Sequence, residues 1–236
     1  MNDLRALRPA LIGFWLAAAA CSVANAAGPS WPNTFAARVE ALALLQTLNA
    51  DLLSHDSATV TLERWCTLHR MAPIPHVVAI QMRVEPKAPT DEQRQALRIG
   101  PTDPVRYRHV QLVCGSLVLS EADNWYVPAR LTPEMNHLLE TTDAPFGAVV
   151  RELHFQRHTL SARLLWTPLP AGWEMNAQSA DQGSEQIAVP AEVLEHRAVL
   201  SLPDGTPFSE VVETYTGNVL AFPAPPAQSA AGAGKP

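Results

Sequence analysis

The residues best suited to chemistry lie in a segment with the pattern of two β-strands, residues 105–128. Arg106 and Arg108 fall on the same face of the first strand, because successive side chains point to opposite sides of a sheet. The rest of that face is apolar. A guanidinium keeps its charge, so an arginine at the edge of a buried face requires an anion from the protein or from a ligand. The alternative is an arginine whose stem covers apolar surface while its head group reaches water.

Glu213 is the second candidate. It belongs to a predicted strand at 208–215 and shares a face with Val211 and Tyr215. A carboxyl group in apolar surroundings can exchange a proton near neutral pH, which suits general acid–base catalysis. The opposite face of this strand is about as apolar, so alternation alone leaves open a role as a solvent-facing residue.

A third candidate is the start of a short helix predicted at 143–150. The first free amides, near Phe146 and Gly147, coincide with the positive end of the helix dipole and could bind a carboxylate or phosphate. Water is the usual occupant of such a helix start.

The spacing of the possible ligand residues does not support a metal site. His154 and His158 share a strand face, but four strand residues span roughly 13 Å, too far for a common ion. Neither a CxxC pair nor a nucleophile elbow, a phosphate-binding glycine loop or an HExxH motif occurs. We therefore expect no metal site.

Composition places the chain among ordinary globular proteins. It has 236 residues, 47% of them hydrophobic, and a net charge of -6 without a basic patch. The length allows a sizeable core, and the charge argues against nucleic-acid binding. Nothing in the composition fixes an oligomeric state.

The first 26 residues have the features of a secretory signal, with arginines, an apolar run and small residues at a cleavage site. We therefore predict an exported protein, periplasmic or secreted, without a stable membrane span after cleavage. Lipid attachment at Cys21 and an uncleaved anchor are the alternatives. In an exported chain, Cys66 and Cys114 could form a disulfide or remain free and buried.

Hydrophobic periodicity predicts helices at 34–53, 57–69, 91–99, 132–140 and 143–150. Alternation predicts strands at 77–85, on both sides of Gly115-Ser116, and at 153–160, 162–167, 193–202 and 208–215. The fold class is therefore α+β, with an antiparallel sheet of about six strands and helices on one face. We expect one domain, 27–220, followed by a disordered tail, 221–236, rich in Ala and Pro.

Several short motifs occur in an order that resembles the chorismate lyase family and the related ligand-binding UTRA domains. They are RYRHVQLVC at 106–114, WYVP at 125–128, TDAPFG at 142–147 and VVETYTG at 211–217, together with DSAT at 56–59. The resemblance covers most of the chain from about Leu52 to Tyr215.

The resemblance implies an internal site where chorismate is converted to 4-hydroxybenzoate and pyruvate without a cofactor. Arg108 would bind the ring carboxylate, the amide of Phe146 would add a hydrogen bond, and Glu213 would move a proton. Arg106 is the alternative anion reader, because the spacing to Cys114 differs by one from the family pattern. Asn124 stands where the family enzymes have a second arginine.

Two functions from different classes follow. The first is an exported lyase that acts on chorismate or a similar cyclic carboxylic acid. The second is a non-catalytic binding module that keeps the cavity for a small aromatic or cyclic acid. A protein that retains only the shell of the fold is a third, structural alternative.

Overall fold

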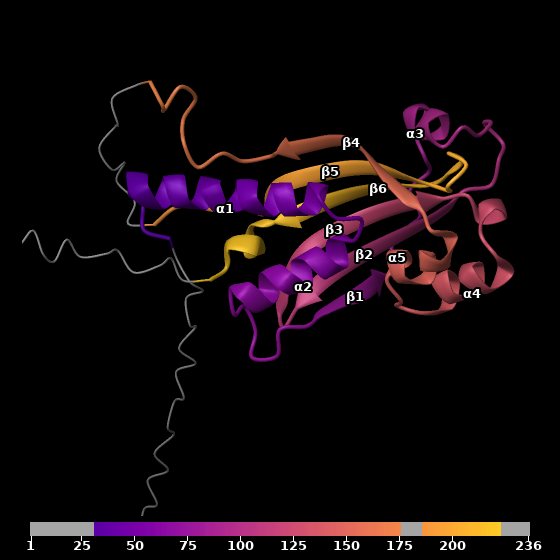
Figure 1. Ribbon diagram of the computed structural model, residues 1–236, viewed down its shortest axis with the longest axis horizontal. Coiled ribbons are helices and arrows are strands. Elements are labelled where there is room, and N and C mark those ends of the chain that lie inside the picture. The colour runs from indigo at the N-terminus through magenta and orange to yellow at the C-terminus, as the bar shows by residue number, and fades with distance from the viewer. Residues whose placement is uncertain (1–30, 176–185, 223–236) are drawn as a thin grey trace, which may run out of the picture.

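A single antiparallel sheet organises the protein. The computed structural model describes residues 31–175 and 186–222, and its six strands are ordered β1-β2-β3-β6-β5-β4 (Figure 1). Their bounds are β1 Val77–Met82, β2 Arg106–Cys114, β3 Leu117–Tyr126, β4 Gln156–Leu164, β5 Glu192–Ser201 and β6 Pro207–Thr216. The predicted α+β class with an antiparallel sheet is confirmed.

The helices begin where the sequence supplies a capping side chain. The α-helices are α1 Phe35–Leu53, α2 Ala58–Leu68, α3 Asp91–Ala96, α4 Pro133–Thr141 and α5 Phe146–Val149, and the short 3-10 helices are η1 Pro128–Arg130, η2 Arg151–Leu153 and η3 Gly217–Leu220. The hydroxyls of Thr34, Ser57, Thr90 and Thr132 each accept a hydrogen bond from an amide three residues later.

Four of the α-helices cover one face of the sheet at two places. In Figure 1, α1 and α2 lie over one part of this face, and α4 and α5 lie toward the other end of the strands. Each pair has its own apolar cluster, the larger one under α1 and α2 and a smaller one around Tyr126 and Phe208. Two separate covers on one face leave the middle of that face available for a cavity.

The opposite face is covered in part by the segment around α3. Leu97, directly after α3, is fully buried and packs with Trp125 and Val127, and Tyr107 packs against the same cluster. Tyr107 and Trp125 are cross-strand partners, so they share this second face. The sequence predicted helices on one face of the sheet only, but α3 lies on the opposite face.

The β2–β3 hairpin turns at Gly115, as predicted. Gly115 has φ +60°, and a Cβ atom there would lie 2.8 Å from the Cβ of Ala72. Only glycine meets both conditions without strain.

The prediction wrongly divided one strand into two. The sequence predicted two strands, 153–160 and 162–167, but β4 is continuous from Gln156 to Leu164. Its pairing with β5 shifts between Thr159 and Ser161, which leaves Leu160 unpaired. The irregularity is therefore a β-bulge inside one strand, and bulges interrupt the side-chain alternation from which strands are read.

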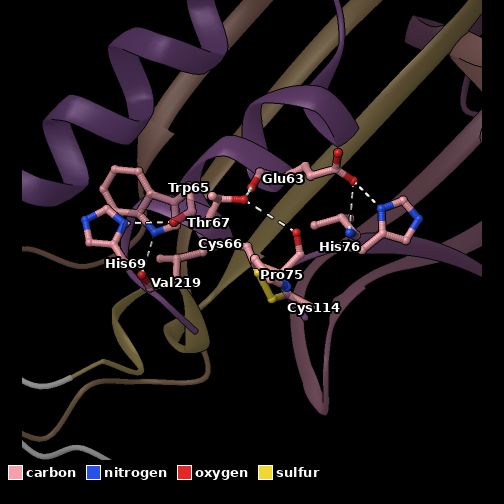
Figure 2. The surroundings of a disulfide bond; sticks show 10 residues. Glu63, Trp65, Cys66, Thr67, His69, Pro75, His76, Cys114 and Val219 are labelled. Carbon is pink, nitrogen blue, oxygen red and sulfur yellow. Dashed lines mark hydrogen bonds and ion pairs between the residues drawn. A yellow bond between two sulfur atoms is a disulfide. The ribbon is translucent and has the colours of Figure 1, made fainter. Parts of the chain in front are cut away.

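A disulfide between Cys66 and Cys114 joins α2 to the end of β2 (Figure 2). Both cysteines are fully buried. The indole of Trp65 next to it donates a 2.8 Å hydrogen bond to the carbonyl of Val219. Of the two alternatives for these cysteines, the structure therefore has the bonded one, and α2 is fixed to the sheet at this point.

The packed chain continues past the predicted domain boundary at residue 220. Phe222 is 6% exposed and stacks on His69, with ring centroids 4.1 Å apart. The predicted signal segment, 1–26, and the rest of the predicted tail, 223–236, lie outside the described residues.

Candidate functional site

A cavity of about 790 Å³ lies between the start of α2 and the segment around α5. Strands β1, β2, β3 and β6 supply most of its floor, and Leu200 of β5 and Arg157 of β4 also line it. Its lining is largely apolar, but it includes Asn124, Arg157 and Glu213, which are predominantly buried. A mostly apolar hollow with a few convergent polar groups is typical of a small-molecule site.

Arg108 and Glu213 lie on the same face of the sheet. Val110 is paired with Ala122 and Ala122 with Glu213, and directly paired residues share a face. Arg108 is two residues from Val110, so it points to that face as well. The two side chains can contribute to one site only if they lie on the same face, so this condition of the prediction is met.

Glu213 forms a buried ion pair that the sequence did not suggest. Its Oε2 accepts a 2.5 Å hydrogen bond from Nη2 of Arg157, and each side chain is 9% exposed. The hydroxyl of Tyr215 donates to the same oxygen at 3.2 Å. The acid–base argument assumed a carboxyl group in apolar surroundings, whereas this carboxylate has a cationic partner.

The charge of Glu213 shifts the pKa values of Arg157 and Tyr215. Burial alone would lower the pKa of Arg157, but the charge of Glu213 and its hydrogen bond raise it overall. Burial, followed by the charge of Glu213, raises the pKa of Tyr215 well above its ordinary value. Arg157 is therefore a fixed cation, and Tyr215 a neutral donor.

Arg157 was missed because nothing in its own strand distinguishes it. It comes from β4, which is separated from β6 by β5, and its side chain reaches across the intervening strand. The one available signal was its position two residues after Phe155, since both line the cavity.

Arg108 is 3% exposed and only part of its guanidinium is bonded. Nη2 donates to the side-chain Oε1 of Gln81 at 3.1 Å and to the carbonyls of Thr142 and Ala144 at 3.3 and 3.2 Å. Nε and Nη1 are buried without a hydrogen-bond partner, and no carboxylate among the described residues lies within ion-pair distance.

Burial lowers the pKa of Arg108, while the nearby Tyr126 and Asp143 oppose this shift. Although Arg108 is not part of the cavity wall itself, it contacts Ala144 and is the cross-strand partner of Asn124, both of which line the cavity. A buried guanidinium with free donors beside a cavity is an anion-receptive group.

Of the other predicted site residues, three line the cavity and one does not. Arg106 is exposed and its Nε lies 3.4 Å from Oε1 of Glu140, so it takes no part in the cavity. Asn124 lines the cavity, and its Oδ1 accepts a 2.7 Å hydrogen bond from the hydroxyl of Ser209. Phe146 and Gly147 line it at the start of α5.

The remaining candidates do not assemble into a metal site. Among residues 31–175 and 186–222, no group of three or more His, Cys, Asp or Glu side chains is arranged to hold a metal ion. The same part of the chain contains no helix with the length and hydropathy of a membrane span.

Comparisons with known proteins give one strong relative. The chain is 58% identical over 196 residues to the uncharacterized protein y4mC of Sinorhizobium fredii, covering 83% of each chain. No protein-family model matches the chain.

Solved structures with a similar arrangement are more distant. PhnF from Mycobacterium smegmatis has 15% identity and a TM-score of 0.45, over 74% of this chain and 70% of that one. A GntR-family transcriptional regulator from Enterococcus faecalis has 14% identity and a TM-score of 0.39, over 62% and 99%. YydK from Bacillus subtilis, described as a possible transcriptional regulator, has 15% identity and a TM-score of 0.38, over 63% of this chain and 62%, less than two thirds, of that chain.

These likenesses contradict three predictions. Two of the three solved structures are described as transcriptional regulators, and none of the three is described as a lyase or as an exported protein. The predicted chorismate lyase activity is therefore wrong, as are the signal-peptide reading and the periplasmic or secreted location. The alternative of a non-catalytic binding module fits the comparisons better. The prediction that Glu213 moves a proton is not tested and stays a prediction.

Proposed function

The chain belongs to the same family as the uncharacterized protein y4mC of Sinorhizobium fredii, and we propose that it is a non-catalytic module that binds a small organic acid in this cavity. The observation that carries the proposal is Arg108, which is buried and has two unpaired donor nitrogens beside the cavity. Leaving charged donors buried without an acceptor is costly, and a ligand carboxylate could accept a charge-assisted hydrogen bond from one of these nitrogens.

The cavity supports a ligand with an apolar ring or chain. Leu112, Val211 and Phe155 contribute apolar surface, while Asn124 and the Arg157–Glu213 pair contribute hydrogen-bonding groups. In this proposal Arg108 fixes the carboxylate, the amides of Phe146 and Gly147 lie at the helix start beside it, and Glu213 accepts a hydrogen bond from a polar group elsewhere on the ligand.

The test compares two arginines that are two residues apart. Benzoate and its neutral counterpart benzamide would be titrated into the wild type, Arg108→Gln and Arg106→Gln by calorimetry. We expect benzoate to bind the wild type more tightly than benzamide, and Arg108→Gln to lose at least about tenfold in benzoate affinity, the value of a charge-assisted hydrogen bond. Arg106→Gln should bind like the wild type because Arg106 is exposed and paired with Glu140.

Arg108 also holds backbone carbonyls, so its replacement could disturb the fold. Arg108→Lys keeps the charge but loses the planar fork, and it should bind benzoate with intermediate affinity. Equal affinity of the wild type for benzoate and benzamide would contradict the proposal without reference to any variant. So would an equal loss in Arg106→Gln and Arg108→Gln.

A further inference from the structure

The side-chain amide of Asn124 presents a hydrogen-bond donor to the cavity. Asn124 is 5% exposed and lines the cavity from β3. Its Oδ1 accepts the hydrogen bond from the hydroxyl of Ser209, whereas its Nδ2 bonds no group among residues 31–175 and 186–222. Unlike the unpartnered nitrogens of Arg108, Nδ2 is not fully buried. Because the residue lines the cavity, the accessible surface of Nδ2 faces the cavity.

Ser209 fixes this orientation of the amide. It is fully buried, and its hydroxyl has no other acceptor in the described part of the chain. Rotating the amide by half a turn would place Nδ2, a donor without a lone pair, against the serine oxygen. The hydroxyl hydrogen would then be buried without an acceptor, which is costly. Ser209 therefore keeps Oδ1 on its own side and the NH₂ group on the cavity side.

Asn124 is also the residue directly opposite Arg108 in the β2–β3 pairing. Directly paired residues share a face, and their Cβ atoms lie about 4.5–5.5 Å apart. Arg108 is a buried cation, and the described residues supply no carboxylate within ion-pair distance of it. An anion that accepts a hydrogen bond from Asn124 would thus bind beside a positive residue, in surroundings where charges interact more strongly than in water.

We propose that Asn124 donates a hydrogen bond to the carboxylate of the ligand, and that Ser209 is the positioning residue that holds Asn124 as a donor. The inference rests on the proposed function, because it names a second reader of the same carboxylate. Asn124 contacts the ligand, whereas Ser209 acts only through Asn124, since it does not line the cavity. A donor at this position selects an acid over its neutral amide.

Two substitutions of Asn124 test the contact with benzoate and benzamide as probes. Asn124→Leu removes the donor at similar volume, and benzoate should lose at least about fivefold in affinity. Asn124→Asp keeps an acceptor for Ser209 but presents a carboxylate oxygen to the cavity. Benzoate should then lose at least about tenfold by repulsion between like charges, and benzamide should become the tighter ligand.

The matched control is Gln95→Glu, which makes the same change from amide to acid on an exposed residue of α3. It should leave both affinities within about twofold of the wild type, because α3 lies on the opposite face of the sheet from the cavity. An equal loss of benzoate affinity in Gln95→Glu and Asn124→Asp would show an effect of net charge alone and contradict the inference.

A double-mutant cycle tests the role of Ser209. Ser209→Ala frees the amide to turn, so benzoate affinity should fall at least about threefold when Asn124 is present. In the Asn124→Leu background the same substitution should have no further effect, because the group that Ser209 positions is already gone. Equal losses in the two backgrounds would mean that Ser209 acts through the packing of the fold, and its positioning role would be wrong.

The wild type provides a measurement that needs no variant to fold. The signal of the Asn124 side-chain NH₂ group in a nitrogen–proton NMR spectrum should shift on addition of benzoate and stay in place on addition of sodium chloride. A signal that does not move while benzoate binds contradicts the contact.

Failure of this inference differs from failure of the proposed function. If the wild type prefers benzoate to benzamide and Asn124→Leu and Asn124→Asp keep that preference, Asn124 is not a reader, while the acid-binding function stands. If the wild type binds the two probes equally, both proposals are contradicted.

Discussion

Arg157 and Glu213 form a 2.5 Å ion pair across an intervening strand, and both side chains are almost completely removed from solvent. The pair joins the edge strand β4 to the centre of the sheet. Two buried charges are tolerated only because they compensate each other and because Tyr215 supplies a further hydrogen bond. Their mutual dependence gives the first prediction.

Removal of one partner should destabilise the protein more than removal of both. Arg157→Met leaves the Glu213 carboxylate buried without a cation, and we expect a loss of about 3–5 kcal/mol in the free energy of unfolding. Combining Arg157→Met with Glu213→Leu should recover much of that loss. Urea denaturation of the single and double variants measures the difference. A double variant no more stable than Arg157→Met would show that the pair is not the source of the effect.

The disulfide should contribute strongly to stability. It closes a loop of 48 residues between Cys66 and Cys114. In the chain-entropy description, a loop of this length stabilises the folded state by about 4 kcal/mol. Reductant should therefore lower the urea midpoint of the wild type. The Cys66→Ala/Cys114→Ala variant should start from the lower midpoint and not respond to reductant; equal midpoints for oxidised and reduced wild type would contradict this.

Stability should fall with decreasing pH because of His196. Burial lowers its pKa below the ordinary value of 6.5, although the charge of Glu213 opposes the shift, and Nε2 lies 2.8 Å from Oδ1 of Asn49. Below pH 6.5 the unfolded state therefore binds more protons than the folded state, so the free energy of unfolding decreases as pH falls through 6.5, by at most about 1.4 kcal/mol per pH unit from this residue.

His69 should contribute to the same pH effect, because burial also lowers its pKa. His196→Gln and His69→Gln should each reduce the pH slope between about pH 7 and pH 5, and the double variant should reduce it most. An unchanged slope in His196→Gln would contradict the assignment. Urea denaturation at several pH values gives the slopes.

Gly217 should not tolerate a side chain. A Cβ atom there would lie 2.3 Å from the carbonyl oxygen of Pro190 and 2.9 Å from Cγ1 of Val189. Gly217→Ala should therefore cost about 1–3 kcal/mol, the range for overpacking.

Gly100→Ala is the matched control for that substitution. Its added Cβ would meet only the side chain of Asp103 at 3.5 Å, an ordinary contact. The two melting temperatures should therefore differ clearly. Similar values would show that the backbone at Pro190 can move away.

The sequence predicted those features that depend on neighbours in the chain. The helices predicted to begin near residues 34 and 57 do begin there, where the hydroxyls of Thr34 and Ser57 form caps, and the glycine at 115 marked the hairpin turn. Alternation assigned Arg108 and Glu213 to particular strand faces. These signals are local, because capping, turn formation and side-chain alternation involve residues within a few positions of each other.

Contacts that depend on the order of strands in the sheet could not be predicted from local sequence patterns. The ion pair joins β4 to β6, residues 56 positions apart, and no pattern within either strand records the other. The burial of Arg108, as against the exposure of Arg106, depends on where the segment after α4 lies, since Thr142 and Ala144 supply its acceptors.

The sequence by itself therefore determined the elements, the α+β class and the residues with chemical potential. The tertiary structure decided which of them meet: it paired Glu213 with a cation and left two donor nitrogens of Arg108 buried without a partner. The physical reason is that hydrogen bonding and alternation act over a few residues, whereas burial and charge pairing depend on which distant segments the sheet brings together.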